Sequence, residues 1–348
     1  MEKYVQTVRQ ISVGLFAAVV TACLAAASPA IIAQRAIDIP PAHPQSDTDS
    51  ILSVMTYNIN GMPFPASYDR APSLREIGLR LAQLRIQGRQ PHIVLLQEAF
   101  TPDAKAIGSI AGYRYVTVGA SPSRQGKVSS QSPGERFLAA PDWLRIVRDG
   151  KLLDGGLMIL SDYPIVRQAG MTFTDDACAG YDCLAAKGVL IAWISIPGRS
   201  EPIAVANTHL NSRRASGVPI PRANAAFARQ VVEAQQFVDR QVSDATGVIF
   251  GGDFNIGHDR SRIAAMISAK GIFAEAQEAT LAAALQSEVL RRNSDFQAIW
   301  KRAKDKQYFR PGKSDRLQFE ALRVPFGITQ GGFRLSDHLG YVADYSIG

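Results

Sequence analysis

Short apolar runs that end in polar residues are the feature that most constrains the fold of this chain. The runs are rich in β-branched and aliphatic residues, have the length of strands, and alternate with longer stretches of helical spacing. Most are apolar on both faces, as in buried sheets, so the pattern predicts an α/β fold. The predicted strands are 51–58, 92–98, 113–118, 157–161, 188–196, 202–209, 247–252 and 340–346, and the predicted helices are 72–87, 222–242, 259–269 and 275–301.

The first fifty residues differ in composition from the rest. Residues 11–33 carry no charge and follow a basic start, which is the pattern of a secretory leader. The string from Val20 to Cys23 resembles a bacterial lipobox, although Cys23 also fits a leader that is cleaved later. Residues 34–50 predict a flexible tether. We therefore expect an exported protein (secreted, periplasmic or lipid-anchored through Cys23) with one domain over 51–348.

Net charge and cysteine content narrow the class of protein further. A formal charge of +7 favours partners that bear phosphate, without choosing between nucleic acid, anionic membrane and phosphorylated metabolites. Three cysteines are too few for a disulfide scaffold. In an oxidising compartment Cys178 and Cys183 are expected to form a local disulfide. A metal site is the alternative, although no histidine lies near them in the sequence.

Polar side chains with metal-binding or acid–base capability follow four of the apolar runs and directly precede a fifth, 340–346. Such residues gather into sites at the ends of strands in layered α/β folds. They are Asn58 and Asn60, Glu98, His209 and Asn211, Asp253 and Asn255, and Asp337 with His338.

This set of side chains suits the hydrolysis of a phosphate ester. Glu98 and Asn58 can offer the oxygen ligands that Mg²⁺ prefers. Asp253 can orient or deprotonate an attacking water, while His209, His338 and Asn255 can hydrogen-bond phosphoryl oxygens. The sequence lacks the HExxH, paired CxxC, Walker and GxSxG motifs, so zinc peptidases, nucleotide kinases and serine hydrolases find no support.

Five short motifs, in this order, resemble the endonuclease/exonuclease/phosphatase superfamily of Mg²⁺-dependent phosphoesterases over residues 51–346. The motifs are Tyr-Asn-Ile-Asn, Leu-Gln-Glu, Asn-Thr-His-Leu, Gly-Asp-Phe-Asn and Ser-Asp-His. The resemblance implies a four-layer α/β/β/α sandwich with two packed mixed β-sheets.

The same resemblance assigns roles to the motif residues. It implies that Glu98 is the principal metal ligand, assisted by Asn58, and that Asp337 is the final metal-side carboxylate. It implies that Asp253 and Asn255 contact the attacking water and the phosphate. His209 would stabilise the phosphate, and His338 would be the acid–base histidine. All of these residues belong to the five motifs.

Residues 182–190 (DCLAAKGVL) are similar to the Lys-Gly segment of neutral sphingomyelinases, the phospholipase C-like branch of the superfamily. The similarity implies that Lys187, together with Asn211, contacts the substrate phosphate; a cationic side chain is physically apt there. A surface lysine at the start of a strand is the alternative interpretation of Lys187.

Two positions depart from the family pattern. Members usually carry an aspartate before the last motif that orients the catalytic histidine, and the best match here is Gln318 within Arg316–Phe319. A glutamine can accept a hydrogen bond but cannot stabilise an imidazolium by charge. Many nucleases also have aspartate where this chain has Asn60.

These observations favour an exported, monomeric Mg²⁺-dependent phosphodiesterase. It would hydrolyse sphingomyelin or a related phospholipid, release phosphocholine by water attack on phosphorus, and make peripheral contact with a membrane. An extracellular endonuclease acting on nucleic acid is the first alternative. A non-catalytic binding protein on the same scaffold is the second. The sequence has no clear apolar hairpin for insertion into a bilayer.

Overall fold

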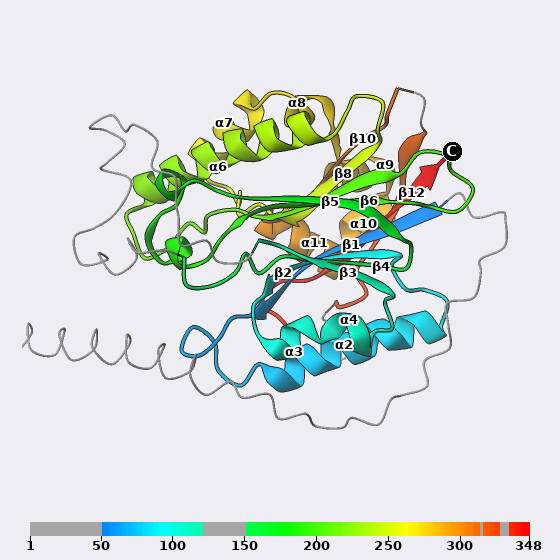
Figure 1. The fold of residues 1–348 in the computed structure, drawn as a ribbon, viewed down its shortest axis with the longest axis horizontal. Coiled ribbons are helices and arrows are strands. Elements are labelled where there is room, and N and C mark those ends of the chain that lie inside the picture. Colours follow the sequence, from blue (N-terminus) through cyan, green and yellow to red (C-terminus); the bar gives the residue numbers. More distant parts are fainter. Residues whose placement is uncertain (1–50, 121–150, 314–315, 328–333) are drawn as a thin grey trace, which may run out of the picture.

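Two six-stranded sheets packed face to face form the centre of the molecule (Figure 1). The computed structural model describes residues 51–120, 151–313, 316–327 and 334–348. In spatial order the first sheet contains β11 (Leu317–Arg323), β12 (Tyr341–Ile347), β1 (Ile51–Gly61), β2 (Ile93–Ala99), β4 (Met158–Ser161) and β3 (Tyr115–Val118). The second contains β5 (Ile165–Thr172), β6 (Gly188–Ile194), β7 (Ile203–His209), β8 (Val248–Asp253), β10 (Asp305–Arg310) and β9 (Gln277–Glu278).

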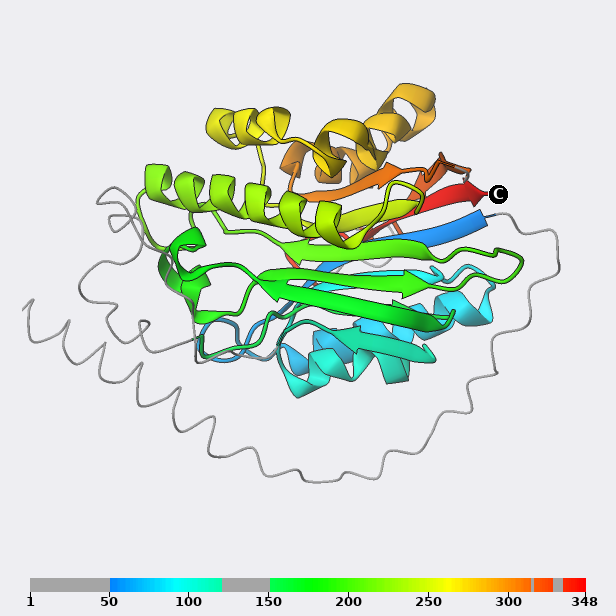
Figure 2. The same cartoon turned by 45° about the horizontal axis from the view of Figure 1, so that its top comes forward.

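Helices cover the outer face of each sheet, so the layers run α/β/β/α, as the family resemblance implies (Figures 1 and 2). The first sheet is covered by α2 (Ala71–Ile86), α3 (Pro102–Lys105) and α4 (Ile107–Ile110). The second is covered by α6 (Ile220–Gln241), α7 (Arg260–Ser268) and α8 (Ile272–Glu275). Against β10 and β11 lie α9 (Ala279–Gln286), α10 (Glu288–Arg292) and α11 (Ser294–Arg302).

The main core lies between the two sheets and is largely aliphatic. Side chains of β1, β2 and β4 meet those of β6, β7 and β8 there, for example Leu95 and Val205, both fully buried. A polar bridge crosses this layer: Gln97 Nε2 donates to Asn207 Oδ1 at 2.8 Å. Asn207 Nδ2 in turn donates to the carbonyls of Leu96 and Met158 at 2.9 and 3.0 Å. The two sheets are therefore joined by directional bonds as well as by apolar contact.

Strand direction places the polar strand ends together. The pairs β1–β2 and β7–β8 are parallel, so their carboxyl ends reach the same edge of each sheet. His209 lies directly opposite Asp253 in the β7–β8 register. The antiparallel strand β10 begins with Asp305, which lies opposite Asp253 on the other side. Three functional side chains thus form one row across the second sheet.

All eight strands expected from the apolar runs are present, with ends shifted by a few residues. The strands β5, β9, β10 and β11 were not predicted. The strand β9 has only two residues, and the other three have partial or alternating burial and lack a continuous apolar run. The prediction of one helix over 275–301 is wrong. Ser287 and Asn293 accept hydrogen bonds from backbone amides just after them and so start new helices, α10 and α11.

The predictions for the leader, the lipobox and the tether concern residues 1–50, which lie outside the described residues. Within the described ranges, none of the helices combines the length and apolar character needed to cross a bilayer.

Candidate active site

Asn58 links a partly buried and a fully buried carboxylate that come from different sheets. Its Nδ2 donates to Glu98 Oε1 at 2.9 Å and to Asp253 Oδ2 at 3.1 Å. The other oxygen of Asp253 accepts from the backbone amide of Asn255 at 2.9 Å. The strand ends of β1, β2 and β8 therefore meet in one hydrogen-bonded cluster, as the sequence pattern suggested.

The backbone at this cluster is unusual for residues with side chains. Glu98, Asn60 and Asn255 have φ values of 59°, 50° and 52°, in the left-handed region. That conformation costs roughly 1–2 kcal/mol for a residue other than glycine, least for asparagine. The surrounding structure holds these residues there, and at Glu98 this turns the side chain out of the strand alternation. Strain of this kind concentrates at functional sites.

His338 is bound on both sides by carboxylates. Its Nδ1 lies 2.8 and 2.9 Å from the two oxygens of Asp305, and its Nε2 lies 3.5 Å from Asp253 Oδ2. Burial alone would lower the pKa of His338, but the charges of Asp305 and Asp253 outweigh it and raise the pKa to about 9. The imidazole is therefore protonated at neutral pH.

His209 faces the same carboxylate in the opposite state. Its Nε2 lies 3.7 Å from Asp253 Oδ2, 3.9 Å from Glu98 Oε1 and 3.2 Å from Lys187 Nζ. Burial, and then the charge of Lys187, lower the pKa of His209 to about 3. Burial would raise the pKa of Asp253, but the charge of His338 counters it and holds that pKa well below its usual value.

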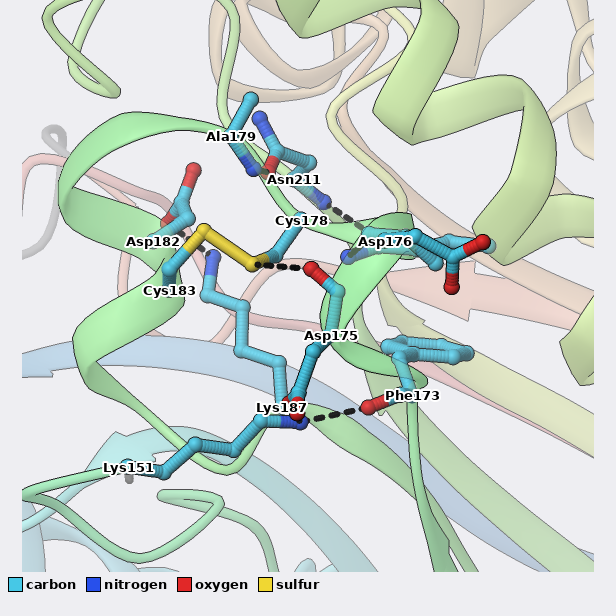
Figure 3. The surroundings of a disulfide bond; sticks show 12 residues. Lys151, Phe173, Asp175, Asp176, Cys178, Ala179, Asp182, Cys183, Lys187 and Asn211 are labelled. Carbon is cyan, nitrogen blue, oxygen red and sulfur yellow. Dashed lines mark hydrogen bonds and ion pairs between the residues drawn. A yellow bond between two sulfur atoms is a disulfide. The ribbon is translucent and has the colours of Figure 1, made fainter. Parts of the chain in front are cut away.

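Lys187 extends past the disulfide to Asp182 (Figure 3). The Nζ–Oδ1 distance is 2.5 Å, and Nζ also donates to the carbonyl of Leu210 at 3.2 Å. The other oxygen of Asp182 accepts from the amide and the hydroxyl of Ser212, both at 2.6 Å. Lys187 is therefore a buried cation of the site, and the surface-lysine alternative does not hold.

The predicted disulfide between Cys178 and Cys183 is present. It joins the two short 3₁₀ turns η2 (Asp175–Ala177) and η3 (Gly180–Leu184). Asn211, predicted at the phosphate, secures this segment: its Oδ1 accepts from the amide of Ala179, and its Nδ2 donates to the carbonyl of Ser212. The second hydrogen of Nδ2 remains for another acceptor, so the predicted phosphate contact stays a prediction.

One expectation needs correction. Gln318 lies exposed on β11 and bonds Arg316, so it does not orient His338; Asp305 does. Asp337 lies at the rim, where its carboxylate is 60% exposed and 2.9 Å from Arg302. Its Oδ2 is 3.9 Å from His338 Nε2, and its role as the final metal-side carboxylate stays a prediction.

Arg262 is a second residue that the sequence did not single out. It is fully buried behind the site and donates to the carbonyls of Asn211 and Asn255 at 2.8 and 2.7 Å. Its Nε donates to Asn224 Oδ1 at 2.8 Å. One side chain thus ties together the loops that follow β7 and β8. A buried arginine inside a predicted helix gave no signal for this role.

The donor set fits a hard divalent cation at Glu98. Burial raises the pKa of the Glu98 carboxyl, so a cation beside it would offset an unfavourable environment for the charge. Asn58 could add an oxygen only after its amide turned over, because its Nδ2 faces the carboxylates and its Oδ1 accepts from Asn60. Ligand atoms of Asp253, Asp305 and His338 also lie within 4.8 Å of one another. That second group is better described as a charged histidine between two carboxylates, since an imidazolium cannot bind a metal.

Known proteins resemble this chain in sequence or in fold. The sphingomyelinase of Mycobacterium tuberculosis is 28% identical over 214 residues, which are 60% of this chain and 35% of that protein. The chain thus matches only about a third of its curated relative. The crystal structure of sphingomyelinase C from Streptomyces griseocarneus superimposes with a TM-score of 0.54 at 22% identity, over 84% of this chain and 99% of that one.

A third comparison is with the beta toxin of Staphylococcus aureus, whose crystal structure contains bound magnesium ions. It has a TM-score of 0.53 at 17% identity, over 84% of this chain and 98% of that one. At such identities these two structures establish the fold. The profile of the Endonuclease/Exonuclease/phosphatase family matches residues 55–316, well over half of the sequence. The chain therefore belongs to the Endonuclease/Exonuclease/phosphatase family.

Proposed function

We propose that the protein is an exported, Mg²⁺-dependent phosphodiesterase that hydrolyses sphingomyelin or a related phospholipid and releases phosphocholine. The observation that carries the proposal is the Glu98–Asn58–Asp253 cluster flanked by a neutral and a protonated histidine. The sphingomyelinase relative supports the lipid substrate, and the magnesium in the beta toxin structure supports the choice of metal. The closed disulfide agrees with an oxidising compartment.

Glu98 would hold the cation, which would supply positive charge to the phosphoryl oxygens. Asp253 orients the attacking water and accepts a proton from it as its oxygen bonds phosphorus. His338 donates its Nε2 proton to the departing alkoxide, which breaks the bond between phosphorus and the ceramide oxygen. The proton on Asp253 then passes to His338 Nε2, 3.5 Å away, and restores both groups. Asn255 Nδ2 donates one hydrogen to the carbonyl of Leu210, and its second hydrogen is available to a phosphoryl oxygen. Lys187 adds a fixed positive charge.

Turnover of three substrate classes tests this proposal. The full chain is incubated with sphingomyelin in detergent micelles, plasmid DNA and inositol phosphates, each with and without Mg²⁺. We expect Mg²⁺-dependent release of phosphocholine. Cleavage of DNA alone would support the endonuclease alternative. No turnover of any substrate, with no rise of Tm on adding Mg²⁺, would support the binding-protein alternative.

Glu98→Gln tests the cation assignment, because the neutral amide keeps the shape of the side chain but loses its charge. We expect a loss of about 100-fold or more in Mg²⁺-dependent turnover. We also expect the Mg²⁺-induced rise of Tm to disappear. The matched control is Glu76→Gln, which affects an exposed glutamate of α2 paired with Arg80. Full Mg²⁺-dependent activity in the Glu98 variant would contradict the assignment.

A further inference from the structure

The loop between β1 and α2 presents two aromatic rings to solvent. Phe64 is 53% exposed and Tyr68 is 83% exposed, which is high for large apolar side chains. The loop follows directly after Asn58 and Asn60, so its base is part of the phosphoesterase site. In both views it lies, in blue, at the same end of the molecule as the green turns around the disulfide (Figures 1 and 2).

Hydrogen bonds hold this loop in place. Ser67 Oγ donates to Asn60 Oδ1 at 2.8 Å, and the amide of Ala66 donates to the carbonyl of Pro63 at 3.0 Å. Arg70 closes the loop by donating to the carbonyls of Ile59 and Leu335, at 3.0 and 2.5 Å. The two rings are therefore carried on an ordered turn, and little conformational entropy would be lost when a partner covers them.

The chemistry of the loop favours a neutral lipid surface over nucleic acid. Residues 62–69 (MPFPASYD) contain one charged side chain, the exposed Asp69, and no cation. The guanidinium of Arg70 is turned inward to backbone carbonyls. A phosphate backbone would find no positive charge here, whereas aromatic rings with a polar edge are favoured at the interface between lipid and water. A third aromatic side chain, Tyr181 of η3, is 47% exposed at the same end.

We propose that the Met62–Asp69 loop is a docking surface for a zwitterionic phospholipid bilayer, with Phe64 and Tyr68 entering the headgroup region. Docking there holds the Glu98–Asp253 cluster against the headgroups. This inference rests on the proposed function, since it says how that site meets its substrate. It supplies a membrane contact that does not depend on an apolar hairpin.

Binding to vesicles tests the docking surface directly. Phe64→Ala/Tyr68→Ala is compared with the unchanged full chain by cosedimentation with phosphatidylcholine vesicles, with and without sphingomyelin. We expect binding to weaken by about tenfold or more, because two aromatic side chains lose their burial in the bilayer. Binding of the unchanged chain should vary little with salt, because the contact is apolar. Turnover of sphingomyelin in vesicles should fall in parallel, relative to a water-soluble phosphodiester.

Leu285→Ala/Val289→Ala is the matched control. These side chains are 74% and 82% exposed on α9 and α10, outside the loop. We expect this variant to bind vesicles like the unchanged chain. Equal vesicle binding by the loop variant and the unchanged chain would overturn the docking surface while leaving sphingomyelin hydrolysis intact. The docking surface would also be overturned if the loop variant lost only turnover of single-stranded DNA, because the rings would then stack on bases. Vesicle binding through the loop without any sphingomyelin turnover would instead reject the proposed function alone.

Discussion

At the scale of single residues, the site separates two histidines by their surroundings. His209 is buried beside the cation of Lys187, and His338 is buried between the anions Asp305 and Asp253. Both imidazoles face Asp253, so one carboxylate is shared by a neutral and a protonated ring. Pairs of titratable groups whose environments drive their pKa values apart mark acid and base roles. Under the proposed function, His338 is therefore the proton donor.

Asp305→Asn should change the pH dependence of turnover. The pKa of His338, raised to about 9, should fall toward its ordinary value once the charge of Asp305 is removed. Because the protonated ring is the active form, activity is present below this pKa and lost above it. The alkaline limb of the kcat/KM profile should therefore move to lower pH in the variant.

The same charge pair contributes to stability. A histidine whose pKa is raised on folding stabilises the fold fully below its unfolded pKa of roughly 6.5, and this contribution is lost as pH rises through about 9. The free energy of urea unfolding should therefore differ more between the Asp305→Asn variant and the unchanged chain at about pH 6 than at about pH 10.

If the alkaline limb of the kcat/KM profile did not move in the variant, the role given to Asp305 would be contradicted.

The sequence predicted most of the side chains in this site but not Asp305. Four of them lie at the carboxyl ends of apolar strands that pair in parallel, so the strand ends bring them together: Asn58, Glu98, His209 and Asp253. Asp305 begins an antiparallel strand with alternating burial and reaches Asp253 only through cross-strand register. No local sequence pattern predicts such a pairing. By the family pattern, the position that orients the histidine was matched to Gln318 on β11, whereas the aspartate that does so is Asp305 on the preceding strand, β10.

At the scale of elements, the approach of β8 to β7 decides where Asp253 lies. Gly252 has a φ of 147°, and an added Cβ would lie 2.1 Å from the carbonyl oxygen of Thr208 on β7. A side chain at this position would push the two parallel strands apart. Since His209 and Asp253 face each other in the next register position, the site depends on this glycine.

Gly252→Ala should therefore lower the free energy of unfolding by about 3 kcal/mol and reduce Mg²⁺-dependent turnover. Urea unfolding and kcat/KM measure the two effects. Gly88→Ala is the control, because Gly88 also has a positive φ, 66°, but an added Cβ would meet nothing within 4 Å. It should cost only the backbone term, roughly 1–2 kcal/mol, and leave turnover unchanged. Equal effects of the two changes would show that the clash with Thr208 is relieved without displacing β8.

Element prediction succeeded where one physical signal dominated. Continuous apolar runs identified the buried strands, and the 3.6-residue period identified α2 and α6. Element prediction failed over 275–301, where the composition stays typical of a helix although two N-cap residues divide the segment into separate helices. Ser287 and Asn293 each accept backbone hydrogen bonds that restart the helix, which composition averaged over a window does not register.

At the scale of the whole molecule, the motifs serve the fold as well as the site. In Leu-Gln-Glu, Glu98 reaches the site while the preceding residue, Gln97, reaches across to the other sheet. In Asn-Thr-His, Asn207 completes the bridge while His209, two residues later on the same face and at the end of β7, reaches the site. Stability and catalysis are thus encoded in neighbouring residues of the same strings.

Asn207→Ala should destabilise the whole molecule, because it leaves the carbonyls of Leu96 and Met158 without their donor in the dry layer between the sheets. We expect the free energy of unfolding to fall by about 2–4 kcal/mol, from unpaired polar groups and the cavity together. Urea unfolding followed by circular dichroism measures this change. Gln318→Ala, at an exposed position on β11, should change it by less than about 0.5 kcal/mol. If both variants unfolded at the same urea concentration, the apolar layer alone would be holding the two sheets in register, and the polar bridge would serve only to select that register during folding.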